Sequence, residues 1–248
     1  AKKLSQDRRV RRVDLLTRRI IDSKVDAVYS KEEEQIEKIV PLSEMKDLIK
    51  ERTNFRDFGV FGTFFKSNPK VDDIPEKYSI MYEGVRFLQF GLPKEGGSGC
   101  YCAENELIRE LMKHLLIEND DVVIMDMEAG IEHLGRATVD FVDAMIIVVE
   151  PTQRSLGTAA QIKTLSRDIG LKRLWLVGNK IRSEEEISFL KENSPGLPLL
   201  GTLPMDLGVL DADRLGEPVY DHVPSLREAA AKIASQLQEP YPQEFLQE

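Results

Sequence analysis

The chain has 248 residues, of which 42% are hydrophobic and 31% are charged, which is enough apolar material for the core of a large domain. Its 43 acidic residues outnumber its 34 Lys and Arg residues, and the formal charge of −9 argues against a protein that binds nucleic acid or an anionic membrane. No apolar run approaches the roughly 20 residues that span a bilayer, and residues 1–12 lack the apolar stretch of a signal peptide. These features predict a cytoplasmic protein with a single domain over residues 1–248.

The first part of the chain has little regular patterning. Residues 7–19 hold six arginines in thirteen positions, a composition typical of a solvated helix face or a poorly ordered terminus. Residues 36–52 are predicted to form a polar surface helix, and residues 55–75, rich in Gly, Phe, Asn and Asp, an irregular segment. We therefore expect residues 1–35 to be atypical and the regular core to lie within residues 36–237.

Short apolar runs alternate with segments of helical period from Phe87 onward. The runs are apolar enough for strands that are covered on both faces: FLQFG (87–91), VVIMD (122–126), AMIIVVEP (144–151), LWLVGN (174–179) and LLGTLP (199–204). Helices are predicted to follow Cys102 and over residues 153–169, 184–192 and 225–237. This alternation predicts an α/β fold with a doubly wound, mainly parallel sheet flanked by helices.

Polar residues follow three of the predicted strands, at the edge where doubly wound sheets bind their ligands. Asp126 ends VVIMD, where a carboxylate can hold Mg²⁺ through its water shell, and nearby Gly130 allows a backbone N–H to approach a phosphate. Asn179 ends a later strand and can offer its carbonyl and its amide to a purine base. Pro204 and Asp206 begin a loop that would cover the same base.

These residues also have ordinary structural interpretations. An Asp at the end of a strand can simply cap the next helix, so Asp126 alone does not establish phosphate chemistry. Pro204 and Asp206 are equally compatible with a plain turn from a strand into a helix. The sequence pattern by itself leaves both alternatives open.

The two cysteines of the chain, Cys100 and Cys102, stand one residue apart in GGSGCYC. In a reducing cytoplasm such a pair is expected to remain available for metal or redox chemistry rather than to form a structural disulfide. Two thiolates cannot complete a tetrahedral zinc-type site, but a two-fold axis near this loop would bring four of them together. The alternatives are a redox pair and a chance placement at the start of a helix.

Several segments together give the chain a family resemblance. It resembles the nickel-insertion accessory ATPases of carbon monoxide dehydrogenase, the CooC type, within the MinD/ParA-like branch of P-loop proteins. The resemblance covers approximately residues 36–235. Its motifs are IVPLSEMK (39–46), NPKVDDIPEKY (68–78), GGSGCYCAEN (96–105), DMEAGIEHLGR (126–136), VDAMIIVVEPTQRS (142–155), VGNK (177–180) and GEPV (216–219).

The resemblance implies a role for five residues. Cys100 and Cys102 correspond to metal ligands at a dimer interface, for Ni²⁺ or Zn²⁺. Asp126 corresponds to the Walker-B acid, Gly130 lies in the switch that senses the terminal phosphate, and Asn179 recognises adenine. The resemblance further implies ATP or ADP with Mg²⁺ as cofactor, a homodimer, and nucleotide-dependent delivery of nickel to a carbon monoxide dehydrogenase or a related acetyl-CoA synthase.

The start of the chain departs from this family. Members begin with a strand and a Gly-rich loop, Lys-Gly-Gly-x-Gly-Lys-Thr, whereas the 248 residues contain no Gly-Lys dipeptide. Residues 1–6 (AKKLSQ) resemble the helix after that loop, so the sequence is expected to begin downstream of it. The acidic cluster of the family's next strand is also missing. ATPase activity therefore stays open, and two alternatives remain: an inactive, metal-bridged dimeric binding module and a thiol redox protein.

Overall fold

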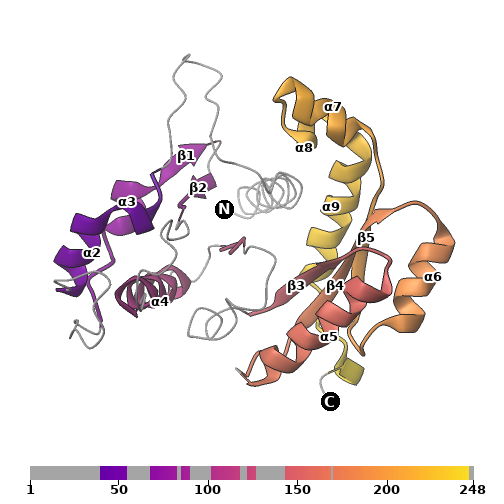
Figure 1. Cartoon of the computed structure of the whole chain (residues 1–248), viewed down its shortest axis with the longest axis horizontal. Helices are drawn as coiled ribbons and strands as arrows, with labels where there is room; N and C mark the ends of the chain where they lie inside the picture. The colour runs from indigo at the N-terminus through magenta and orange to yellow at the C-terminus, as the bar shows by residue number, and fades with distance from the viewer. Residues whose placement is uncertain are drawn as a thin grey trace, which may run out of the picture. The chain divides into compact units, whose positions relative to one another are not determined.

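The computed structural model describes residues 40–54, 68–82, 85–89, 102–117, 122–126, 143–168 and 170–245. These residues belong to two compact units (Figure 1). One unit contains the described residues from 40 to 125, and the other contains Asp126 and the residues from 143 onward. The arginine-rich run 7–19 and the rest of residues 1–35 lie outside the described residues, and the assignment of the whole chain to one domain stays a prediction.

The C-terminal unit is built on a parallel sheet. Its strands are β3 (Met145–Val149), β4 (Leu174–Ile181) and β5 (Leu199–Pro204), in the order β3-β4-β5. The register of the first pair runs from Met145 opposite Leu174 to Val149 opposite Gly178. These strands confirm the last three apolar runs, because helices lie on both faces of the sheet and most strand side chains are buried or partly buried. Val148 of β3 is an exception, with 57% of its surface exposed.

Helices cover the two faces of this sheet. Helices α5 (Gln153–Asp168) and α6 (Glu184–Asn193) lie on one face and α9 (Pro224–Leu237) on the other (Figure 1). Two glycines let the helices approach closely. A Cβ atom at Gly178 would lie 2.6 Å from Leu190 Cδ1 of α6, and one at Gly201 would lie 2.6 Å from Ile233 Cγ1 of α9. The three helices match the segments predicted from periodicity.

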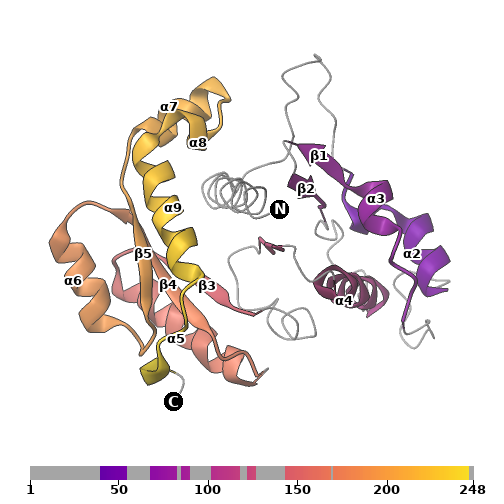
Figure 2. The ribbon, with the colours of Figure 1, turned by 180° about the vertical axis from the view of Figure 1, so that it is seen from behind.

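The chain between β5 and α9 is also helical. Helices α7 (Gly208–Leu215) and α8 (Val219–His222) lie beyond the end of β5, and the chain then returns along α9 (Figure 2). After α9, a 3₁₀ turn, η3 (Gln243–Phe245), follows Tyr241, which is buried and donates its hydroxyl hydrogen to the Leu174 carbonyl oxygen at 2.9 Å. This bond ties the C-terminal segment to the start of β4.

The N-terminal unit is mainly helical. It contains η1 (Leu42–Glu44), α2 (Lys46–Thr53), α3 (Ile74–Tyr78), α4 (Cys102–Ile117) and a hairpin of β1 (Ile80–Tyr82) and β2 (Val85–Phe87). Its buried core joins one apolar face of α4 to α2 and α3, and it consists of Leu42, Leu48, Ile49, Val71, Ile74, Leu107 and Leu111. Helix α4 confirms the helix predicted after Cys102. None of the helices in the described ranges is long and apolar enough to cross a membrane.

Two predictions for the N-terminal unit are wrong. The polar helix over residues 36–52 is broken, because Pro41 is extended and α2 begins only at Lys46 with two buried apolar side chains, Leu48 and Ile49. Of the described residues of FLQFG, 87–89, only Phe87 lies in a strand. That strand, β2, pairs with β1 in an antiparallel hairpin and is not part of the described parallel sheet. Two residues, Glu-Gly, separate the paired Tyr82 and Val85, and a glycine in so short a connection was the hairpin signal.

Two further boundaries differ from the prediction. Residues 122–126 (VVIMD) have no strand assignment, and Val122 is 55% exposed. An apolar run becomes a strand only where a neighbouring strand pairs with it, and no described segment pairs with this one. The irregular segment predicted over 55–75 ends earlier, because α3 begins at Ile74, while residues 55–67 lie outside the described residues.

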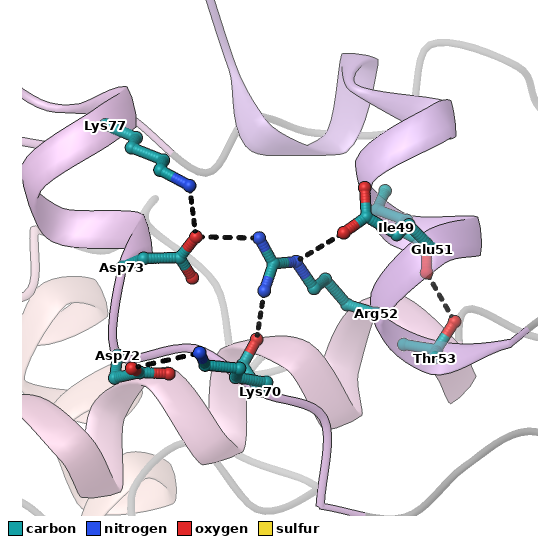
Figure 3. A network of polar contacts seen from close by, with 8 residues as sticks. All are labelled: Ile49, Glu51, Arg52, Thr53, Lys70, Asp72, Asp73 and Lys77. Carbon is teal, nitrogen blue, oxygen red and sulfur yellow. Dashed lines mark hydrogen bonds and ion pairs between the residues drawn. The ribbon is translucent and has the colours of Figure 1, made fainter.

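A polar network joins α2 to the segment before α3 (Figure 3). Arg52 Nη2 donates to Asp73 Oδ2 at 2.8 Å, and Lys77 Nζ donates to the same oxygen at 2.7 Å. Arg52 Nη1 also lies 3.5 Å from the Lys70 carbonyl oxygen. The hydrogen bonds from Lys77 and Arg52 hold the pKa of Asp73 well below its usual value.

This network predicts a loss of stability in acid. A carboxylate with a depressed folded-state pKa stabilises the fold above its unfolded pKa of about 3.9 and loses that contribution as the pH falls through the folded value. Asp73→Asn should therefore lower the urea midpoint at pH 7, and the gap from wild type should shrink as the pH falls below about 4. Asp72→Asn is the matched control, because Asp72 is exposed and lies 3.5 Å from Lys70. An equal difference in urea midpoint between wild type and Asp73→Asn at pH 7 and below a pH of about 4, measured by circular dichroism, would contradict the depressed pKa of Asp73.

Candidate functional site

Polar side chains gather where the three parallel strands end. Glu150 follows β3, Asn179 and Lys180 are near the end of β4, and Pro204 is the last residue of β5. Parallel strands place their carboxyl ends at one edge of the sheet, so these residues share that edge. The structure thus brings together two of the predicted site residues, Asn179 and Pro204, which are 25 positions apart in the sequence (204 − 179).

A bulge in β4 presents Asn179. Gly178 pairs with Thr202 and Ile181 pairs with Pro204, so β4 uses three residue steps where β5 uses two. The additional residue is accommodated at Lys180, whose φ of 58° lies in the left-handed region. Asn179 is partly buried, and its Oδ1 accepts a hydrogen bond from the Lys180 backbone N–H at 2.9 Å. A β-bulge is a device that re-aims side chains next to binding sites.

An ion pair crosses the edge from β4 to β3. Lys180 Nζ lies 2.5 Å from Glu150 Oε1, while the Glu150 backbone N–H donates to Ser155 Oγ at 3.1 Å. The side chains of Lys180 and Glu150 are 56% and 48% exposed, and exposed pairs of this kind contribute about 0–1 kcal/mol. The pair therefore adds little to global stability and acts locally, on the end of β4. The residue pattern alone did not indicate a role for Lys180 or Glu150, although opposite charges at the ends of successive strands were a usable signal.

Asp206 has a structural role that the structure makes explicit. Its Oδ2 accepts a hydrogen bond from the Ser225 hydroxyl at 2.7 Å, and its Oδ1 accepts one from the Gly208 backbone N–H at 2.8 Å. These two bonds lower the pKa of Asp206. They join the start of α7 to the start of α9. This agrees with the structural interpretation of Asp206 as part of a turn from a strand into a helix. A contact between Asp206 or Pro204 and a cofactor stays a prediction.

The remaining predicted site residues are not placed with this edge. Asp126 is exposed at the end of the segment 122–126, whereas Gly130 and Cys100 lie outside the described residues. Cys102 is the first residue of α4, and its side chain is not described. Within the described ranges, no three His, Cys, Asp or Glu side chains gather into a group that could hold a metal ion. The roles of Asp126, Gly130, Cys100 and Cys102 therefore rest on the sequence.

Known proteins resemble this chain in sequence and in fold, although no family model matches it. It is 40% identical over 206 residues to the carbon monoxide dehydrogenase accessory protein CooC of Rhodospirillum rubrum, covering 83% of this chain and 78% of that protein. It is 45% identical over 185 residues to an uncharacterised ATP-binding protein of Methanocaldococcus jannaschii, covering 74% and 72%.

A solved structure supports the fold assignment. The MinD cell division protein of Aquifex aeolicus superposes with a TM-score of 0.53 at 18% identity, over 70% of this chain and 76% of that one. Similarity at this identity indicates a shared fold, an α/β sheet flanked by helices of the P-loop NTPase type. Since the match to CooC is 40% identical and covers more than two thirds of each protein, the chain belongs to the CooC family, and it shares its fold with MinD.

Proposed function

We propose that this chain is an ATP-binding accessory protein for the maturation of carbon monoxide dehydrogenase. The relatives support this proposal: one is an accessory protein of that enzyme and another is an ATP-binding protein. The observation that carries it in this chain is the bulge of β4, which presents Asn179 at the carboxyl edge of a parallel sheet. This edge is where doubly wound folds bind nucleotides.

The nucleotide would be held by groups of two kinds. An Asn amide can pair with the base, because it has both a carbonyl oxygen and N–H donors. An exposed carboxylate such as Asp126 is a suitable partner for the water shell of Mg²⁺, a hard cation that prefers oxygen ligands. Bound Mg²⁺ would neutralise phosphate charge, and Asp126 is the residue of this chain that would hold it.

Nickel is the cargo in this proposal, and the chain would act as a nucleotide-dependent metallochaperone. Cys100 and Cys102 of two protomers would supply four thiolates to one Ni²⁺ or Zn²⁺ ion at a two-fold axis, making the protein a homodimer. The recipient would be carbon monoxide dehydrogenase or acetyl-CoA synthase. Support for the metal site comes from the Cys-x-Cys pattern, which has too few ligands to be complete in one protomer.

Binding of ATP to the 248-residue chain is the first test. The chain contains no Gly-Lys dipeptide, and phosphate sites derive much of their strength from charged hydrogen bonds. We therefore expect weak binding of a fluorescent ATP analogue, with little preference for ATP over ADP. Asn179→Ala should weaken this binding by about tenfold, because two hydrogen bonds to the base are lost.

Asn193→Ala is the matched control for this measurement. Asn193 ends α6 on the surface and donates its amide hydrogen to the Phe189 carbonyl oxygen at 2.9 Å. Its removal should leave the affinity for ATP unchanged. Equal affinities for wild type and Asn179→Ala, in fluorescence titrations with Mg²⁺ present, would contradict a base site at the end of β4.

A further inference from the structure

Lys180 has an unusual backbone conformation for its residue type. Three non-glycine residues in the described part of the chain have positive φ, namely Asn54, Asn68 and Lys180. Asparagine tolerates the left-handed region because its short side chain can bond locally, whereas lysine has no such compensation. Lys180 also lies inside a strand and not in a turn. A backbone of this kind is retained only where its surroundings enforce it, which points to a local function.

The surroundings of Lys180 hold it from three sides. Its backbone N–H donates to Asn179 Oδ1 at 2.9 Å, and its Nζ pairs with Glu150 Oε1 at 2.5 Å. On the other side of the bulge, Ile181 resumes pairing with β5, where its carbonyl oxygen accepts the Met205 N–H at 2.8 Å. The left-handed conformation of Lys180 is therefore held by the hydrogen bond to Asn179, by the ion pair with Glu150 and by the pairing of Ile181 with β5.

The bond from the Lys180 N–H determines which way the Asn179 amide faces. Only the carbonyl oxygen of an asparagine side chain can accept a hydrogen bond, so Oδ1 must face the Lys180 backbone. The amide still has two Nδ2 donors and a second Oδ1 lone pair. An amide that cannot turn over offers its donor and its acceptor in one fixed order.

A fixed order matters because adenine and guanine present different edges. Adenine has the N6 donor next to the N7 acceptor, and an asparagine pairs with both, whereas guanine has two acceptors, O6 and N7, at the same positions. An amide that turns freely could exchange its donor and acceptor positions and so form hydrogen bonds with another edge of guanine. An amide held in one orientation cannot make this exchange. We propose that Lys180 is a positioning residue, which acts through the Asn179 amide and with help from Glu150 to make this site select adenine over guanine nucleotides. This inference rests on the proposed function.

The backbone of Lys180 should matter more than its charge. The ion pair is about half exposed, and such pairs are weak, so Glu150→Gln should change the preference for ATP over GTP by about threefold at most. Glycine adopts positive φ without strain, so Lys180→Gly should keep the preference within about twofold of wild type. Valine cannot adopt this backbone, and Lys180→Val should reduce the preference by about tenfold as the amide loses its fixed order.

The test compares dissociation constants for ATP and GTP, each measured by competition with a fluorescent ATP analogue. Lys172→Val is the matched control, because Lys172 is an exposed residue just before β4 without positive φ, and it should keep the wild-type ratio. If Lys180 had a purely structural role, Lys180→Val would weaken the binding of ATP and of GTP equally and leave the ratio of their dissociation constants unchanged. If Lys180→Gly keeps the wild-type preference for ATP over GTP and Lys180→Val loses it, the backbone conformation of residue 180 is the cause of the preference.

A second measurement on the wild-type chain does not depend on any variant folding. Nitrogen-15 relaxation of the Asn179 side-chain amide should show it to be as rigid as the backbone before nucleotide is added. A mobile Asn179 amide, or a wild-type ratio retained by Lys180→Val, would overturn the inference while leaving the proposed function intact. If wild type shows no preference between ATP and GTP and Asn179→Ala has no effect, both proposals are wrong.

Discussion

Replacing Cys100 or Cys102 by Ser is expected to abolish binding of Ni²⁺ or Zn²⁺. If two protomers share one tetrahedral site, the reduced wild-type protein should bind about one metal ion per two chains. Each single variant would remove two of the four thiolates from the dimer, which leaves too few soft ligands for a closed site. Metal content after gel filtration, measured by mass spectrometry, gives the stoichiometry. Because thiolates must be deprotonated to bind, the metal-linked dimer should also weaken as the pH falls or when a chelator is added.

The control for this experiment is a histidine. His222→Ala should leave the metal content unchanged, because the proposed site uses only thiolates and the His222 Nδ1 atom lies 2.9 Å from Glu217 Oε2. Stoichiometric metal in the Cys100→Ser, Cys102→Ser double variant would contradict the shared thiolate site. A disulfide-dependent activity without metal stoichiometry would favour the thiol redox alternative. Sedimentation as a monomer with and without metal would remove the bridging role.

ATP hydrolysis by the 248-residue chain is expected to be unmeasurable. Phosphoryl transfer depends on positioning and charge stabilisation by a phosphate loop, its lysine and Mg²⁺, and the chain contains no Gly-Lys dipeptide. A chimera with a Gly-rich loop and the following acidic strand in place of residues 1–29 should hydrolyse ATP only with Mg²⁺ present. Asp126→Asn in that chimera should abolish turnover, because an amide cannot replace the carboxylate that holds the Mg²⁺ water shell.

A matched acidic residue controls for the loss of charge. Asp143 is exposed just before β3, and Asp143→Asn should leave the chimera active. Phosphate release measured at saturating ATP distinguishes the variants. Robust hydrolysis by the unmodified 248-residue chain would show that other residues hold the phosphates. An active Asp126→Asn chimera would instead remove the Walker-B assignment while leaving the loop argument intact.

The sequence alone determined the sheet and helices of the C-terminal unit. The runs that became β3, β4 and β5 are mainly apolar, because helices lie on both faces of the sheet, and this pattern is local and visible in the sequence. The same holds for α5, α6 and α9, whose apolar residues repeat at helical spacing. Placing Asn179 at the ligand-binding edge followed directly, since it comes where an apolar run ends.

The N-terminal unit was harder to predict for a physical reason. Whether FLQFG joins a parallel sheet or a hairpin depends on which segment lies beside it, and Val85–Phe87 found its partner in the adjacent Ile80–Tyr82. The polar character of residues 36–52 suggested a surface helix, yet Leu48 and Ile49 of α2 are buried by contacts with other elements. Pairing partners and burial are properties of the folded chain, so residue patterns alone left them undetermined.

The finer geometry of the candidate site was decided by tertiary structure. The bulge at Lys180 exists because β4 has one residue more than β5 between two fixed pairs, and neither strand shows that mismatch on its own. The Glu150–Lys180 ion pair joins residues 30 positions apart, and the Asp206–Ser225 bond joins residues 19 apart. Residue types and strand ends are local, so the sequence determined that a polar edge would form and that Asn179 would lie there. Register and long-range pairing depend on the packed sheet and its helices, so only the tertiary structure decided how Asn179 is oriented and that Asp206 is held by α9.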